Sequence, residues 1–411
     1  MMVLQLDARN ISSQGDTFLR RLVRRCKRFS KIFPTIISQY RRHYLALAKD
    51  LILASFFRGF EGFKKWCNDY EYELYSDRAN QVMAISEMPT RRLCIFAIYE
   101  PDGLLATTLK LLDHLRDELG FSICLVSNAR INLGELDEIQ KRCFKIIERK
   151  NVGLDFGAYK DALLNCINDP EVNYQNLERV LIANDSMVLL RPLQDVFVEL
   201  DSSACDFWGL AEHGFPKNVL SFRGEINCIA SFFICFKPQV FNSAPFKKFW
   251  HDLKYFSSKR LIVQKAELGL SHILEESGFR GDAYLNANRL WNILRNCDLE
   301  ALKNEVNDSR PSIENPTFRK TTYASCFLAD WFHVGIDSQP YFLLRYLPRL
   351  PYLKKWAFYG LSAKSELIFS ELKKRESEGK FIVSSEDIAR EMHCYHAEAF
   401  KKSLNMDECK S

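Results

Sequence analysis

The sequence lacks an uncharged apolar stretch long enough to cross a membrane. A spanning helix needs about 18 such residues, and even the apolar run over 45–57 contains Lys49 and Asp50. No short apolar core followed by small residues marks an N-terminal export signal. The 13 cysteines form no CxxC pair and are odd in number, which fits reduced thiols better than a disulfide framework. We therefore expect a globular, cytoplasmic protein.

Excess positive charge is absent from most of the chain. Residues 1–66 carry 14 Lys/Arg against 4 Asp/Glu, whereas the whole chain has a net charge of only +5. Over 17–64, apolar residues recur at helical spacing opposite basic ones, and Pro34 separates two helical patterns. Such helices either bind an anionic membrane surface or pack on the main domain. We expect a basic helical segment over 1–90, with peripheral binding at the inner face of the cell membrane, and no nucleic-acid partner because the remainder is acidic.

Strand and helix patterns alternate from residue 91 onward. Alternation of this kind predicts the α/β class, with a mainly parallel sheet covered by helices on both faces. Ligands of such sheets bind at the carboxyl ends of the strands. We expect a domain over 91–350 and a C-terminal helical tail over 351–411. The predicted strands are 93–99, 122–127, 144–147, 177–183, 206–210 and 230–236, and the predicted helices are 104–119, 136–139, 156–167, 246–256 and 265–277.

Three small polar residues follow the strand predicted at 177–183. Asn184, Asp185 and Ser186 stand between two apolar runs in LERVLIANDSMVLLRPL. A carboxylate at the end of a buried strand can bind Mg²⁺ or Mn²⁺, which prefer oxygen ligands. Asn184 and Ser186 would then be neutral donors or supporting groups beside it. Taken alone, such a triplet is more often a turn whose side chains cap the backbone.

A second polar group of residues lies in KNVGLDFGAY, residues 150–159. Gly153 and Gly157 allow the backbone to approach a ligand, and Asp155 lies between them at the start of a predicted helix. The segment is neither a GxGxxG fingerprint nor a phosphate loop. Asp155 is either a common helix N-cap residue or a hydrogen-bond partner of a nucleotide.

Taken in order, these segments resemble the rhamnan synthesis protein F family of glycosyltransferases. The resemblance spans 91–349 and rests on KNVGLDFGAYKDAL, VLIANDSMVLL, DFWGL and ASFFICFKPQVFNSAPFKKFW. It implies a GT-A-type nucleotide-diphospho-sugar transferase fold, in which Asn-Asp-Ser replaces the more usual Asp-x-Asp metal motif. Asp185 and Ser186 would then hold Mn²⁺ or Mg²⁺. Because a hydroxyl is a weaker ligand than a carboxylate, Ser186 predicts loose binding of the metal.

The same resemblance implies a set of residues that bind the nucleotide sugar. These are Asn151, Gly153, Asp155 and Asn184. An inverting transferase also needs a carboxylate base for the acceptor hydroxyl, and the candidate is Glu267, near the start of a predicted helix. The alternative is a first-turn Glu favoured by the helix dipole. Weaker candidates are His333 at the diphosphate, His213 at the acceptor, and Trp208, Trp250 and Trp331, which either stack on sugar or fill the core.

The preferred interpretation is a glycosyltransferase acting in polysaccharide synthesis. It would move a sugar, such as rhamnose or another deoxyhexose, from a nucleotide-diphosphate donor to a cell-surface polysaccharide or a lipid-linked precursor. The alternative is a non-catalytic nucleotide-sugar or glycan-binding subunit of an assembly complex, because position 186 lacks a second carboxylate. A Rossmann-type oxidoreductase is disfavoured, since no glycine fingerprint opens the first βα turn at 99–103.

Overall fold

The computed structural model describes seven stretches of the chain. They are residues 81–218, 221–256, 259–296, 340–347, 349–358, 363–379 and 381–391. Apart from Asn218 and Ser221, each at one end of a strand, the elements discussed below belong to one compact unit within 64–217 and 222–411. The expectations for 17–64, Trp331 and His333 fall outside the described residues. Among the described residues, no helix has the length and apolar character needed to cross a membrane.

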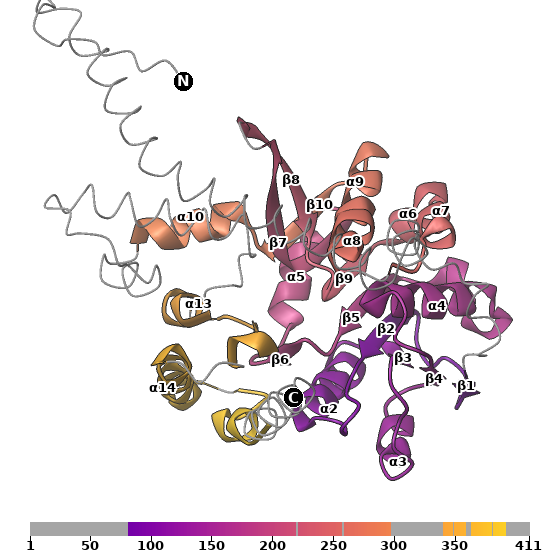
Figure 1. Ribbon diagram of the computed structural model, residues 1–411, viewed down its shortest axis with the longest axis horizontal. Helices are drawn as coiled ribbons and strands as arrows, with labels where there is room; N and C mark the ends of the chain where they lie inside the picture. The colour runs from indigo at the N-terminus through magenta and orange to yellow at the C-terminus, as the bar shows by residue number, and fades with distance from the viewer. Residues whose placement is uncertain are drawn as a thin grey trace, which may run out of the picture. The chain divides into compact units, whose positions relative to one another are not determined.

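A mixed nine-stranded sheet forms the centre of the unit, and its four adjacent strands β4, β3, β2 and β5 are parallel (Figure 1). This confirms the predicted α/β class with a mainly parallel sheet. The strand order is β1 (Gln81–Ala84), β4 (Lys145–Glu148), β3 (Ser122–Ser127), β2 (Arg92–Ile98), β5 (Arg179–Asn184), β9 (Phe233–Phe236), β7 (Phe207–Asn218) and β10 (Gly281–Leu285), with β8 (Ser221–Ile229) beside β7.

The outer strands differ most from the sequence pattern, which predicted none of β1, β8 and β10. The unpredicted β1 lies before residue 91 and pairs antiparallel with β4, while the boundary at 90/91 stays a prediction. The strand expected at 206–210 continues to Asn218, so His213 lies within β7 rather than after a strand. Together β7 and β8 form a long hairpin (Figure 1). Polar and charged residues in this hairpin conceal the strand pattern on which the shorter prediction rested.

Helices cover both faces of the sheet. Alternate residues of β2 point to opposite sides, and because both sets are apolar, both faces have to be buried. Its odd-numbered apolar residues share a core with α4 (Leu154–Asn168), α7 (Ala244–Asp252) and α9 (Leu268–Glu276). Its even-numbered ones share a second core with α2 (Ala106–Asp113) and α5 (Gln194–Ser202). Trp250 and Trp208 are fully buried, one in each core. They fill the interior, as one alternative predicted, and neither ring has an exposed face.

The predicted helices are present with shifted ends. The helix expected at 104–119 is α2 followed by a π-helical segment, η2 (His114–Glu118), and it ends at Gly120, whose φ is +67°. Glycine adopts this left-handed conformation without a steric penalty. The remaining short elements of this part are α3 (Leu136–Gln140), η3 (Pro170–Val172), η4 (Tyr174–Asn176), α6 (Pro238–Phe241), α8 (Lys259–Leu261), η5 (Ile262–Glu267) and α10 (Ala287–Asn296).

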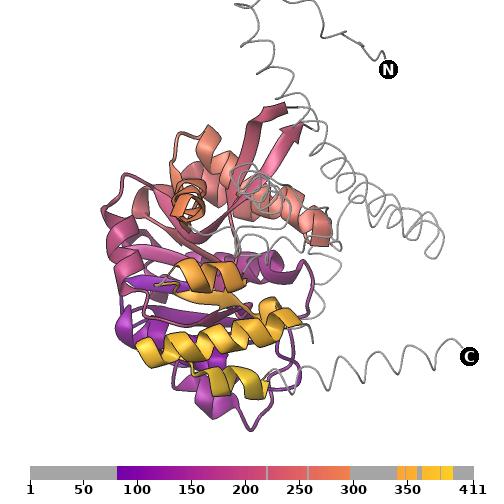
Figure 2. The same cartoon turned by 90° about the vertical axis from the view of Figure 1, so that its left-hand side faces the viewer.

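C-terminal residues form a separate two-stranded sheet with the strand that follows β5. The strand β11 (Tyr352–Lys354) pairs antiparallel with β6 (Met187–Leu189), which follows β5 directly. Apolar residues of α13 (Pro340–Tyr346), the 3₁₀ helix η7 (Lys355–Phe358) and α14 (Ala363–Glu378) join the core that contains α2. Figure 2, seen from their side, shows these orange and yellow helices in front of the sheet, and Figure 1 shows β6 and α2 between them and β2. The pairing with β6 brings β11 next to the end of β5.

Candidate functional site

The order of the strands reverses between β2 and β5. The chain runs outward from β2 through β3 to β4, and then places β5 on the other side of β2. Open α/β sheets bind ligands at such a switch point, outside the carboxyl ends of the strands. The strands are in register there, with Ala97 opposite Asn184. The polar triplet that follows β5 therefore lies at the position where this kind of sheet meets a ligand.

Asp185 bridges the ends of these two strands. Its backbone N–H donates to the carbonyl oxygen of Ala97 (3.2 Å), and its Oδ2 accepts a hydrogen bond from the N–H of Tyr99 (3.0 Å). Burial raises the pKa of Asp185 to about 6, and the negative charges of Glu100 and Asp155 raise it as well, while Lys355 opposes them. The fold thus holds a carboxylate at the switch point in surroundings that disfavour its charged form.

Asn184 and Ser186 form a closed hydrogen-bonded group with Asp155. The side-chain amide of Asn184 donates from Nδ2 to Asp155 Oδ2 (2.9 Å). Its Oδ1 accepts from the Ser186 backbone N–H (3.1 Å) and from the Ser186 hydroxyl (2.5 Å). The capped turn expected from the residue types is therefore present. The same turn connects the end of β5 to the first turn of α4, which contains Asp155.

Two glycines allow α4 to begin close to this group. Gly153 is the N-cap residue of the helix and has a φ of +75°. Asp155 follows it by two positions and lies in the first turn. A Cβ on Gly157 would lie 2.0 Å from the carbonyl oxygen of Val152, so only glycine fits there. Asn151 is exposed in the loop before the helix. The nucleotide contacts predicted for Asn151, Gly153, Asp155 and Asn184 stay predictions. The side chains of Asp155 and Asn184 are hydrogen-bonded to each other.

Glu267 joins the group through the turn before β9. Its Oε1 accepts from the N–H of Ser231 (2.8 Å), and the carbonyl oxygen of Ser231 accepts from the Tyr159 hydroxyl (3.0 Å). The next residue, Phe232, accepts a hydrogen bond from the N–H of Asn184 (3.1 Å). One two-residue turn therefore links the candidate base to the end of β5. Glu267 also raises the pKa of Asp155, after the larger effect of burial.

The position of Glu267 in its helix differs from the expectation. It is the last residue of the π-helical segment η5, with α8 before it and α9 after it. It therefore does not lie in a first helical turn, and the helix-dipole alternative is wrong. The pattern beginning at residue 265 missed the earlier turns because a π segment changes the spacing of buried residues. π segments inside helices are frequent at functional sites.

Sequence reasoning missed two lysines at this site. Lys354 donates from Nζ to the Ser186 hydroxyl (2.6 Å), and this ammonium lies 3.8 Å from the centre of the Phe232 ring. Lys355 donates to Glu100 Oε1 and to the Thr108 hydroxyl, both at 3.0 Å. The charged side chains of Lys355 and Glu100 are each only 5% exposed. Adjacent residues of a strand end point to opposite sides, which explains their different partners.

The donor atoms around Asp185 do not fit a divalent-metal site. Asn184 Oδ1 is used by Ser186, and the Ser186 hydroxyl accepts from Lys354. In the part of the chain that the structure describes, no three His, Cys, Asp or Glu side chains are grouped closely enough to hold a metal ion. A cation at Ser186 would also be repelled by the ammonium beside it. The metal role predicted for Asp185 and Ser186 stays a prediction, and these contacts oppose it.

A family model identifies the chain. The model of the family described as rhamnan synthesis protein F matches residues 123–407, which is most of the sequence. The chain belongs to the rhamnan synthesis protein F family. The family resemblance noted from the sequence motifs is thereby confirmed. The α/β class with a mainly parallel sheet, which it also implied, is confirmed by the strand pairing, and the GT-A type stays a prediction.

This rhamnan synthesis protein F family member also resembles individual proteins. The uncharacterized protein y4gN of Sinorhizobium fredii (strain NBRC 101917 / NGR234) is 27% identical over 212 residues, which cover 51% of this chain and 52% of that protein. The chain thus spans about half the length of this curated relative.

Two solved structures show a weaker likeness to the same family member. The glycosyltransferase GlyE of Streptococcus pneumoniae TIGR4 is 14% identical with a TM-score of 0.32, covering 77% of this chain and 64% of GlyE. Core-mannan synthase A from Aspergillus fumigatus, in an Mn/GDP form, is 8% identical with a TM-score of 0.29, covering 59% of this chain and 85% of the synthase. Similarity this low carries no inference about the site of this chain.

Proposed function

We propose that the protein is a glycosyltransferase that transfers a sugar from a nucleotide-diphosphate donor to a glycan or lipid-linked acceptor. Membership of the rhamnan synthesis protein F family supports this role. The observation that carries it further is the position of Asp185, a carboxylate with a raised pKa at the switch point between β2 and β5. A deoxyhexose such as rhamnose as the donor sugar, and a surface polysaccharide as the product, are part of the proposal.

Each carboxylate at the site has a separate part in the proposed reaction. The bond between the anomeric carbon and the diphosphate oxygen breaks, and its electron pair stays on that oxygen. The acceptor hydroxyl forms the new glycosidic bond and loses its proton, and Glu267 is the proposed base for that proton. Asp155 is proposed to bind the nucleotide, positioned by its hydrogen bond from Asn184. Asp185 follows Asn184 at the end of β5, where it would orient the donor and is itself held by the hydrogen bond from Tyr99.

The growing charge on the diphosphate requires a cation nearby. A divalent ion, Mn²⁺ or Mg²⁺, would supply it by neutralising the phosphate oxygens, and Asp185 is the residue proposed from the sequence to hold that ion. Lys354, at the end of β11, and Lys355, the first residue of η7, are a second source of positive charge at this end of β5. The contacts of Ser186 favour the lysines.

Turnover of sugar nucleotides tests the proposal. UDP-, dTDP- and GDP-sugars would be incubated with the protein, with water or an added lipid extract as acceptor, and the released nucleoside diphosphate measured. We expect release by the wild type, and a loss of about 100-fold or more in Asp185→Asn and in Glu267→Gln. Circular dichroism would establish that both variants are folded.

Two outcomes would contradict the proposal in different ways. A folded Asp185→Asn variant with wild-type turnover would remove Asp185 from the mechanism. Tight binding of a sugar nucleotide without release under any condition would instead favour the non-catalytic binding subunit. That alternative keeps its support from position 186, where a serine occupied by internal hydrogen bonds stands in place of a carboxylate.

A further inference from the structure

We propose that Lys354, and not a divalent cation, neutralises the diphosphate of the donor in this protein. This inference rests on the proposed function and concerns the same site. It predicts transfer that continues when divalent metals are removed. It is drawn from the contacts of Ser186, Phe232, Lys354 and Lys355. The sequence motifs assigned no diphosphate-binding role to either lysine.

The first step concerns where β11 places the Lys354 side chain. The antiparallel register sets Lys354 opposite Met187, the first residue of β6, and the N–H of Lys355 donates to the Ser186 carbonyl oxygen (2.9 Å). The Lys354 ammonium lies 2.6 Å from the Ser186 hydroxyl oxygen and 3.8 Å from the centre of the Phe232 ring. Its side chain is partly exposed. A cation is thus held at the carboxyl end of β5, with access to solvent.

The second step concerns competition with a metal. A divalent ion would have to bind Ser186 at about 2.0 to 2.6 Å through the same hydroxyl that accepts from Lys354. The side-chain oxygen of Asn184, Oδ1, already accepts two hydrogen bonds from Ser186. Of the predicted triplet, Asp185 alone would remain as a ligand, beside a fixed positive charge. An ammonium already in place needs no such ligand set.

The third step separates the two lysines. Lys355 is buried and held by Glu100, so a ligand cannot reach it, whereas Lys354 is only partly buried. Lys354 lies on the other side of the strand end, near Asp155, whose pKa it lowers against the larger effect of burial. Lys354 is therefore the lysine that a diphosphate at the switch point would meet. During transfer it keeps its proton and stabilises the oxygen that receives the electron pair of the broken bond.

Binding of nucleoside diphosphates tests this inference without knowledge of the acceptor. UDP, dTDP, GDP and ADP, with the matching monophosphates, would be titrated by calorimetry in EDTA and again with MnCl₂. We expect one diphosphate to bind the wild type equally well in both buffers. In Lys354→Met its affinity should fall by about tenfold or more, whereas monophosphate affinity should change little. Lys354→Arg should retain most of the affinity, and Lys374→Met, an exposed lysine of α14, should match the wild type.

The outcomes distinguish failure of this inference from failure of the proposed function. Diphosphate binding that requires MnCl₂ in the wild type would overturn the role of Lys354 and leave the glycosyltransferase proposal standing. Unchanged diphosphate affinity in a folded Lys354→Met variant would overturn it as well. If these nucleotides do not bind in either buffer and the sugar nucleotides of the turnover assay also fail to bind when titrated in the same way, the proposed function itself is overturned. Because the buffer comparison uses the wild type, it remains decisive even if Lys354→Met fails to fold.

Discussion

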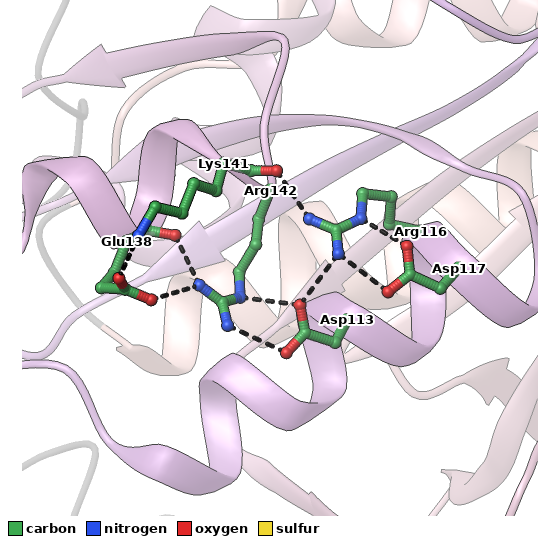
Figure 3. A network of polar contacts seen from close by, with 6 residues as sticks. All are labelled: Asp113, Arg116, Asp117, Glu138, Lys141 and Arg142. Atoms are coloured by element: carbon green, nitrogen blue, oxygen red, sulfur yellow. Dashed lines mark hydrogen bonds and ion pairs between the residues drawn. The ribbon is translucent and has the colours of Figure 1, made fainter.

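Two groups of charged residues in this protein have opposite properties. The surface network in Figure 3 joins α2, η2 and α3 through six charged residues, Asp113, Arg116, Asp117, Glu138, Lys141 and Arg142. The switch-point group contains Glu100, Asp155, Asp185, Glu267, Lys354 and Lys355. The surface network consists of ion pairs between neighbouring charged side chains, and it contains no predicted site residue.

The pKa shifts show how the two groups differ. A hydrogen bond from Lys141 lowers the pKa of Glu138, and one from Arg116 lowers that of Asp117, so the network stabilises their charged forms. Burial raises the pKa of Asp185 and of Asp155, so the switch-point group keeps carboxylates whose charge is disfavoured. A fold retains such groups at functional sites more often than elsewhere. The direction of the shift, and not the number of ion pairs, distinguishes the candidate site.

The largest expected effect comes from Lys355→Met. The side chains of Lys355 and Glu100 are each only 5% exposed, so removing the lysine leaves the Glu100 carboxylate buried without this ion-pair partner. We expect the free energy of unfolding to fall by about 3 to 5 kcal/mol. Denaturant unfolding followed by circular dichroism would measure it. The double variant Glu100→Gln with Lys355→Met should recover much of the loss, and a double variant no more stable than Lys355→Met would contradict this account.

Asp185→Asn is expected to raise the free energy of unfolding at high pH, by less than Lys355→Met lowers it. Because the folded pKa of about 6 lies above the ordinary value, the native carboxyl contributes stability below about pH 4 that is lost as the pH rises through 6. The variant should therefore match the wild type at pH 4 and be more stable by about 1 to 3 kcal/mol at pH 8, while turnover is lost. Unfolding curves across this pH range would measure the difference.

A matched control for the pH experiment comes from the surface network. The pKa of Asp117 is lowered, first by its hydrogen bond with Arg116. Its contribution is present above the ordinary pKa and is lost as the pH falls. Asp117→Asn should therefore lower stability at neutral pH relative to acid pH. If both variants showed the same sign, the distinction between the two groups would be wrong.

The smallest effect is expected from Lys141→Met. The side chain of Lys141 is 65% exposed and that of its partner Glu138 is 47% exposed, so solvent screens their interaction. We expect a thermal unfolding midpoint within the error of the wild-type value, and unchanged turnover. A clear drop in the unfolding midpoint or in turnover would show that the surface network contributes to stability or to activity.

Local sequence patterns predicted much of the fold. The apolar runs of β2, β3 and β5 and the periodicity of α4 are strong because both faces of the parallel strands are buried. β1 and β11 were missed because runs of four and three residues carry little pattern. The π segments η2 and η5 were read as ordinary helix, since their spacing differs from 3.6 residues only locally.

The candidate site was predictable only in part. Asn184, Asp185 and Asp155 stand out because polar residues next to buried strands or glycines are unusual. Glu100 and Lys355 carry no such signal, because the residues are 255 positions apart and meet only when β11 packs against β6. The same holds for Lys354 and Ser186, which are 168 positions apart.

The sequence by itself determined where buried strands end in polar residues, and where glycine lets α4 begin close to them. These are local properties, set by hydrophobic periodicity and by the conformations that glycine allows. Only the tertiary structure decided the charge around Asp185. Strand pairing between β6 and β11 places an ammonium on Ser186, and burial at the switch point raises the pKa of the carboxylate beside it. Both depend on contacts between distant segments and on exclusion of water, which no local pattern encodes.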